Sequence, residues 1–390
     1  MANSVITSTG SYLPSEIIPN EFFIRNEFYG ADGNKLSRLN ADIIKKLFEI
    51  TGIRERRYVT EELSTSDISY LAAEQALEGL DRESLDYIIV AQNFGDVQSD
   101  NIRTDMVPTI ASRVKHKLKI KNPYTIAFDI PFGCPGWLQA MITADYIIKS
   151  GDAKRILVIG AEILSRVSDP HDVDSMIYGD GAGATMLEAT DRNVGILSHV
   201  SRSDTHDNAY LLFLGKTYNR QRNGNDLYIK MHGHEIYKYA VRTVPEVVRK
   251  NLEKTGLGIG DVNKILIHQA NEKMDEAIVQ YMKRKYNMLV GERTAEEVKM
   301  TIGTATAHTK TTTMEIKGRD LVEGVPKNLN ITDEEIVERR KLADDLRQHP
   351  IPRCQLGSSL RNSFVVGIVA LGPSAQGKKT IDVSVHDLRV

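Results

Sequence analysis

The sequence predicts an α/β protein in which strands and helices alternate in two successive rounds, so that helices cover the faces of the sheets. Continuous apolar runs, typical of strands buried on both faces, occur at residues 85–93, 124–130 and 155–163. Segments with helical spacing of apolar residues accompany them. A second alternation begins near residue 193, without a fixed sequence period. This pattern indicates a duplicated architecture with parallel or mixed sheets.

The first round begins with a short strand at residues 4–14, which runs into a Gly/Pro turn. Helical periodicity at 67–80 follows three hydroxyl side chains at 64–66, any of which can serve as the N-cap. An apolar helix after the strand at 124–130 is closed by Gly151. The stretch GDGAGATMLEAT, residues 179–190, predicts a glycine-rich turn that enters a further strand.

The second round has a strand at 193–203, a helix at 235–254, a strand at 262–270 and a helix at 272–285. After about Tyr286 the rhythm changes. A polar, Thr-rich and strand-like region is followed by a charged amphipathic helix at 331–349, and by strands at 362–372 and 379–388. This third region does not continue the alternation of the first two.

The composition excludes several classes of protein. The chain has 390 residues, 41% of them hydrophobic, and a formal net charge of −2. That length suits one large duplicated domain or two to three ordinary ones. The near-zero charge gives no general attraction to nucleic acid or to a membrane surface. We also find no signal-peptide pattern and no apolar run long enough to span a membrane, so we expect no nucleic-acid or membrane partner.

Cys134 lies in the stretch FDIPFGCPGW, at a turn between a predicted buried strand and a helix. The helix N-terminus offers positive partial charge and free N–H groups to a thiolate or to a developing oxyanion, which favours a nucleophile. The alternative is a buried, inert cysteine, as most free cysteines are. The other cysteine, Cys354, does not complete a disulfide or metal spacing, so we expect a reducing, cytoplasmic location.

His268 ends the predicted strand at 262–270, where a side chain would face a crevice at the carboxyl edge of the sheet. A neutral imidazole there can activate a thiol or donate to a carbonyl, and a surface histidine is the alternative. Two motifs carry no site in our interpretation. HGHE at 232–235 is expected to begin a helix rather than to bind a metal, and GDGAGA is expected to form a tight turn rather than a phosphate site.

Taken together, these residues resemble the beta-ketoacyl-acyl-carrier-protein synthase III family, which has the thiolase fold. The resemblance covers residue 1 to about 280, with the motifs in the family's order and at about its spacing. The matching stretches are STGSYLP (8–14), TGIRERR (51–57), the Cys134 turn, GDGAGA (179–184), MHGHEIYKYAV (231–241) and HQAN (268–271). The implied fold has thiolase-like duplicated α-β-α-β-α layers.

The resemblance implies an acyltransferase that performs a two-step Claisen condensation, as in the initiation of fatty acid biosynthesis. Cys134 takes an acyl group from an acyl-CoA, and His268 stabilises the enolate formed when malonyl-acyl-carrier protein loses carbon dioxide. Lys273 occupies the place of a basic residue that meets the carrier protein, and a solvated helix lysine is the alternative. No metal or cofactor is implied, since the coenzyme A thioester is a substrate. Family members are homodimers, and the loop that reaches the neighbouring subunit falls here between Asn93 and Val107.

The sequence departs from the family after the HQAN motif. The family's second donor, an asparagine in a GNTSAAS-like turn, has no counterpart in EEVKMTIGTATAH (296–308). A Trp and an Arg that clamp the coenzyme A adenine are replaced by residues such as Lys46 and Ile50. The second half of the fold is therefore expected to be incomplete, with a strand near 364–371 as a substitute for the missing ones.

Residues 274–338 instead resemble part of the bacterial actin-like cell-shape protein, which makes the chain an apparent chimera joined within NEKMDEAI (271–278). We divide the chain at residues 1–185 (the half with the nucleophile), 186–285 (start of the second half), 286–340 (actin-like segment) and 341–390 (unassigned). Two alternatives to the condensing enzyme stay open. One is a thiolase-fold protein that acylates itself without condensing, and the other is an actin-like nucleotide-binding protein.

Overall fold

The computed structural model describes residues 2–222, 224–258, 264–267, 288–289, 313–320, 326–332, 364–373 and 379–386. Its largest sheet has the strand order β1-β7-β6-β4-β5. β4 is parallel to both β5 and β6, whereas β7 is antiparallel to β6 and to β1. The strands are β1 (Asn3–Tyr12), β4 (Tyr87–Ala91), β5 (Ile126–Ile130), β6 (Arg155–Ile163) and β7 (Asp180–Thr190).

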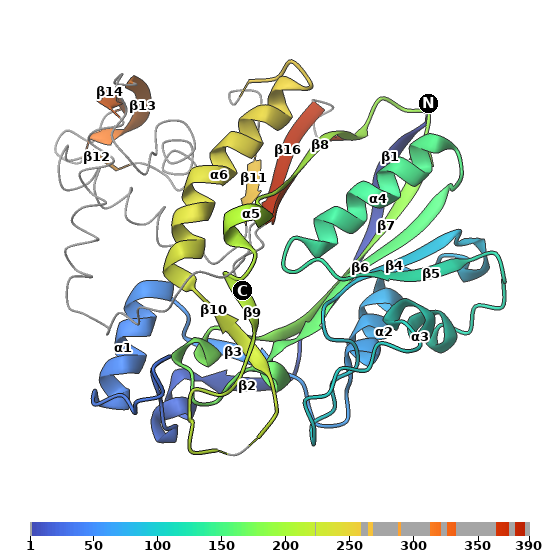
Figure 1. Cartoon of the computed structure of the whole chain (residues 1–390). Coiled ribbons are helices and arrows are strands. Elements are labelled where there is room, and N and C mark those ends of the chain that lie inside the picture. Colours follow the sequence, from blue (N-terminus) through green and yellow to red (C-terminus); the bar gives the residue numbers. More distant parts are fainter. Residues whose placement is uncertain are drawn as a thin grey trace.

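Helices cover both faces of this sheet (Figure 1). α2 (Thr65–Ala76) and α3 (Ile110–Lys117) pack on one face, where they form a buried apolar core with alternate residues of β4 and β6. α4 (Gly136–Ser150) packs on the opposite face against the other set, which includes Ile89 and Val158. Because both faces are covered, the central strands consist of apolar residues throughout, which explains the continuous runs in the sequence.

A second sheet has the order β11-β16-β15-β8, and α6 (Gly233–Glu253) packs on it (Figure 1). Its strands are β8 (Gly195–Ser203), β11 (Lys264–Ile267), β15 (Phe364–Pro373) and β16 (Lys379–His386). α4 contacts β8 and β15 as well as the first sheet. The predicted layered α/β class is thus confirmed. β15 pairs with β8 on one side and β16 on the other, so two segments of the stretch left unassigned at 341–390 are strands of this sheet.

Smaller elements surround these layers. Two-stranded sheets join β2 (Glu16–Pro19) to β3 (Glu55–Tyr58) and β9 (Leu212–Gly215) to β10 (Tyr228–Met231). A separate sheet contains β12 (Met288–Leu289), β13 (Thr313–Asp320) and β14 (Pro326–Thr332). The remaining helices are η1 (Asn20–Arg25), α1 (Asn40–Thr51), η2 (Arg82–Ser84), η3 (Leu164–Val167), η4 (Val173–Met176) and α5 (Thr205–Asn208).

Several local predictions can be compared with these bounds. Ser64 precedes α2, and its N–H donates to the Asp67 carboxylate at 2.9 Å, so Ser64 is the N-cap among the three candidates. Gly151 ends α4 in the left-handed conformation, at φ 86°. The GDGAGA turn is a wrong prediction. Residues 180–184 already belong to β7, where they pair with β1 on one side and β6 on the other. The small side chains there belong to a strand that has a neighbouring strand on each side, and they do not form a turn.

Candidate active site

Cys134 lies in the turn between β5 and α4, and its side chain is partly exposed. Gly133, immediately before it, has φ +74°, a conformation that favours glycine. Pro135 is the N-cap of α4, and in the described part of the chain no side chain caps the first turn of this helix. The positive end of the helix dipole is therefore available to the group beside it, as the sequence predicted.

Three strand ends meet at this turn. Because β4, β5 and β6 run parallel, their carboxyl ends lie at the same edge of the sheet. Asn93 follows β4, the Cys134 turn follows β5, and Glu162 is the penultimate residue of β6. Open α/β sheets bind their ligands at such an edge. Asn93 and Glu162 were not identified as site residues from the sequence, although each is a polar residue at the end of an apolar run.

Hydrogen bonds connect these three strand ends. The Glu162 carboxylate oxygen Oε2 accepts from both the backbone N–H and the side-chain amide of Asn93, each at 2.8 Å. The Oδ1 atom of Asn93 then accepts from the backbone N–H of Gly133 at 2.9 Å. Burial raises the pKa of Glu162 to about 7. Its other oxygen, Oε1, is buried without a hydrogen-bond partner in the described structure.

Close packing fixes the start of α4 on the sheet. A Cβ atom at Gly136 would come within 3.0 Å of the Ala91 side chain. Likewise, a Cβ atom at Gly160 of β6 would lie 3.0 Å from the Trp137 Cβ. Trp137 also directs its indole N–H toward the Thr185 hydroxyl of β7, at 3.3 Å. The glycines allow the helix to approach β4 and β6 closely, and this approach places the turn before it.

Tyr178 is a buried neighbour of Cys134 that the sequence did not indicate. Burial raises the pKa of its phenol, and charges on Asp174, Asp172 and Cys134 add to the shift. Its hydroxyl has no hydrogen-bond partner in the described residues. The ring packs in an apolar cluster made of Val97, Leu164, Val167 and Ile229.

The other predicted site residues are placed only in part. β11 ends at Ile267, so the predicted strand leading to His268 is present, but His268 and Lys273 lie outside the described residues. The two positions that replace the adenine clamp are both on α1. Lys46 pairs with Glu49 at 3.5 Å, and Ile50 is exposed. HGHE begins α6 as expected, with His232 as the N-cap.

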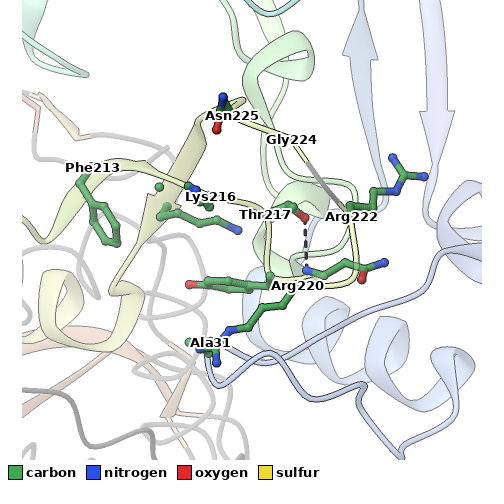
Figure 2. Close-up of a pocket in the computed structure, with 12 residues that line it drawn as sticks. Ala31, Phe213, Lys216, Thr217, Arg220, Arg222, Gly224 and Asn225 are labelled. Atoms are coloured by element: carbon green, nitrogen blue, oxygen red, sulfur yellow. Dashed lines mark hydrogen bonds between the residues drawn. The ribbon is translucent and has the colours of Figure 1, made fainter.

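A basic cavity of about 740 Å³ opens beside the loop between β9 and β10 (Figure 2). Lys216, Arg220 and Arg222 line it together with the polar side chains of Thr217, Asn219 and Asn225. Arg220 also donates to the Ala31 carbonyl oxygen at 3.2 Å, which ties the cavity to the segment before α1. Cys134 is not among its lining residues. Within the described ranges, no helix is long and apolar enough to cross a membrane, and no three His, Cys, Asp or Glu side chains cluster as metal ligands would.

Comparison with known proteins agrees with this geometry. The family model of 3-oxoacyl-acyl-carrier-protein synthase III matches residues 128–205, which include the Cys134 turn. Beta-ketoacyl-acyl-carrier-protein synthase III of Cereibacter sphaeroides is 32% identical over 287 residues, covering 72% of this chain and 80% of the relative. The enzyme of that name from Clostridium perfringens is 34% identical over 286 residues, covering 72% and 81%.

Solved structures give the same result. The 3-oxoacyl-acyl-carrier-protein synthase III of Aquifex aeolicus has 32% identity and a TM-score of 0.55, covering 72% of this chain and 81% of that one. The Thermus thermophilus enzyme has 28% identity and a TM-score of 0.56, covering 69% and 78%. These neighbours confirm the predicted thiolase-like fold.

The C-terminal part matches a different family. The model of the MreB/Mbl protein matches residues 257–348, which confirms the predicted change of family along the chain. This match overlaps the end of the region similar to the synthases. Over most of its length, however, both sequence and fold follow the synthases, and the chain belongs to the beta-ketoacyl-acyl-carrier-protein synthase III family of condensing acyltransferases.

Proposed function

We propose that this enzyme condenses an acyl-CoA primer with malonyl-acyl-carrier protein through an acyl-cysteine at Cys134, as in the initiation of fatty acid biosynthesis. The observation that carries the proposal is the position of Cys134. It lies at the carboxyl edge of three parallel strands, before a helix whose first turn is capped by no side chain of the described residues.

In the first step, the Cys134 thiolate attacks the thioester carbonyl carbon, and coenzyme A leaves as its thiolate. Negative charge develops on the carbonyl oxygen during the attack. The Cys134 amide and the start of α4 supply N–H groups and positive partial charge at this position. In this proposal the turn after Gly133, which has φ +74°, presents the sulfur and the amide to the same carbonyl group.

In the second step, malonyl-acyl-carrier protein loses carbon dioxide and leaves an enolate, whose carbon attacks the acyl-cysteine and releases the Cys134 thiolate. His268 is proposed to donate a hydrogen bond to the enolate oxygen, which favours decarboxylation. Lys273 is proposed to meet the acidic carrier protein. The loss of carbon dioxide supplies the enolate and drives formation of the carbon–carbon bond. The proposed reaction therefore needs no cofactor.

We further propose a cytoplasmic homodimer. Among the described strands, β5 lies at an edge of the first sheet, and apolar side chains in and before this strand are exposed. Tyr124, two residues before β5, is 83% exposed, and Ile126 of β5 is 47% exposed. Large apolar groups beside an unpaired strand edge are typical of a subunit interface. The mass of the protein in solution, measured by light scattering, tests this point.

The central test is intact-protein mass spectrometry after incubation with acyl-CoA thioesters of several chain lengths. The wild type and the Cys354→Ala variant should each gain one acyl group, because Cys354 is not the nucleophile. The Cys134→Ala variant should gain none. An unmodified wild type, or acylation that persists without Cys134, would contradict the proposal.

One observation favours a second candidate, a protein that acylates itself but does not condense. The asparagine donor of the family has no counterpart at 296–308. Removing one such donor costs on the order of 3 kcal/mol of transition-state stabilisation, or about 100-fold in rate. If acyl-Cys134 forms but addition of malonyl-acyl-carrier protein yields no 3-oxoacyl product, this candidate replaces the first.

A further inference from the structure

We propose that Asn93 and Glu162 are positioning residues for the nucleophile, and that they set the geometry of the Cys134 turn through the backbone N–H of Gly133. The inference rests on the proposed function, since it concerns the same thiol. Neither side chain belongs to the motifs that identified the family.

The hydrogen bonds of the Asn93 side chain hold its amide in one orientation. Oδ1 of Asn93 accepts from the Gly133 N–H at 2.9 Å, one residue before the nucleophile. An amide side chain can rotate, and rotation by half a turn would present its NH₂ group to that donor instead. Glu162 prevents this exchange, because its Oε2 accepts the Asn93 NH₂ at 2.8 Å. The same oxygen accepts the Asn93 backbone N–H at 2.8 Å.

These hydrogen bonds also join three parallel strands at their ends. Glu162 belongs to β6, Asn93 follows β4, and Gly133 follows β5. Each strand is fixed in the sheet by its backbone pairing. The hydrogen bonds therefore fix the Cys134 turn to the sheet. Without them the turn could rearrange at Gly133, which has φ +74°.

This arrangement has a cost in stability. Glu162 places a carboxyl group where one of its oxygens, Oε1, is buried and has no partner in the described structure. A buried, unsatisfied polar atom is destabilising, and a core residue selected for stability alone would be apolar. Such local costs are concentrated at functional sites.

Gln92 provides a matched control for the experiment. It is the residue before Asn93, is 2% exposed, and also has a fully engaged amide. Its Oε1 accepts from the Gly95 N–H at 2.7 Å, and its Nε2 donates to the Asp129 carboxylate at 3.0 Å. These bonds do not reach the Cys134 turn. Gln92→Ala therefore removes a buried amide and its stability contribution without removing the link.

The experiment compares Asn93→Ala, Asn93→Asp and the exchange variant Asn93→Asp/Glu162→Gln with Gln92→Ala, all in a Cys354→Ser background so that Cys134 is the only thiol. Two rates are measured on the folded proteins. The first is acylation by saturating acyl-CoA, and the second is alkylation by iodoacetamide across pH 5–10. The second rate needs no acyl-CoA, so it reports on the turn even if acylation fails.

Asn93→Ala and Asn93→Asp should slow acylation about 10- to 100-fold, the effect of a small misplacement of a reacting group. They should also move the alkylation profile to higher pH, because the sulfur loses its position at the start of α4. In the exchange variant, the Gln side chain at position 162 can donate to the Asp carboxylate at position 93. This variant should therefore recover most of the acylation rate and most of the alkylation rate. Gln92→Ala should match the parent protein within about threefold.

Equal alkylation profiles for the Asn93 variants and Gln92→Ala would overturn the inference, as would an exchange variant no better than Asn93→Asp. A parent protein that is alkylated normally but never acylated would overturn the proposed function instead, while the alkylation profiles would still decide the role of Asn93 and Glu162.

Discussion

The ammonium group of Lys230 lies 2.5 Å from the Asp169 carboxylate, and the lysine side chain is only 1% exposed. A second carboxylate, that of Asp172, lies 3.0 Å from the same nitrogen. The ammonium also lies 3.4 Å from the centre of the Tyr218 ring, on the loop that lines the basic cavity. This cluster joins β10 to the segment after η3, and so connects the β9–β10 hairpin to the first sheet.

Replacing Lys230 with Met should destabilise the protein strongly. The substitution keeps much of the apolar stem but leaves two buried carboxylates without their cation, which typically costs 3–5 kcal/mol. Urea unfolding measures the difference. Lys238→Met is the matched control, because Lys238 pairs with Glu235 at 3.1 Å on an exposed face of α6, where such pairs contribute at most about 0.5 kcal/mol. Similar losses for both variants would show that the buried cluster is not important for stability.

Tyr178→Phe is expected to leave stability unchanged or to increase it by up to about 1 kcal/mol. The hydroxyl of Tyr178 is buried and has no partner among the residues that the structure describes, so its removal eliminates an unsatisfied group. Tyr239→Phe is the contrasting variant, since its hydroxyl donates to the Asp204 carboxylate at 2.6 Å, and its loss should cost about 1.5–3 kcal/mol. Thermal unfolding of both variants checks this. A large loss in Tyr178→Phe would mean that the hydroxyl has an essential partner.

The sequence predicted the elements that bury apolar runs. The strand at 155–163 has the bounds of β6, and α4 ends at the predicted Gly151. Such segments are predictable because a strand covered on both faces must be apolar throughout, and because a left-handed residue after a helix is most often glycine. The position of Cys134 between a strand and a helix was predictable for the same reason, whereas its role as the nucleophile stays a prediction.

The other residues around Cys134 could not be predicted from the local sequence pattern. Asn93 and Glu162 are 69 positions apart, and their contact depends on which strands are neighbours in the sheet. The strand order β6-β4-β5 differs from the order along the chain, and the periodicity of apolar residues does not predict it. The same applies to β15, whose place between β8 and β16 comes from pairing across more than 150 residues. The domain boundaries, His268 and Lys273 stay predictions.

Gly133→Ala should slow acylation of Cys134. A residue with a Cβ atom at φ +74° is strained by about 1–2 kcal/mol, and relief of that strain would rotate the turn that presents the sulfur. Gly79→Ala is a close control, because Gly79 has φ +73° and open space where its Cβ would be. Both variants should lose similar stability in thermal unfolding, but only Gly133→Ala should lose acylation rate, by about tenfold or more. Equal acylation rates in the two variants would show that the conformation of Gly133 does not affect the reaction of Cys134.

Glu162 should make the stability of the protein depend on pH in a defined direction. Burial raises its pKa from the usual value near 4.5 to about 7, so the folded state binds a proton more tightly than the unfolded state. The corresponding stability is fully present below about pH 4.5 and is lost as the pH rises toward 7. Each unit of pKa difference corresponds to about 1.4 kcal/mol.

Glu162→Gln removes this titration while keeping an acceptor for Asn93. The stability of the wild type relative to Glu162→Gln should therefore fall between pH 4.5 and 7, by on the order of 3 kcal/mol, and level off above that range. Urea unfolding of both proteins at a series of pH values measures the difference, with Glu78→Gln as a reference on the exposed surface. A difference that is constant with pH would show that Glu162 is ionised alike in the folded and unfolded states. A difference of opposite slope would show that the folded site stabilises the carboxylate, in which case the two Asn93 hydrogen bonds outweigh burial.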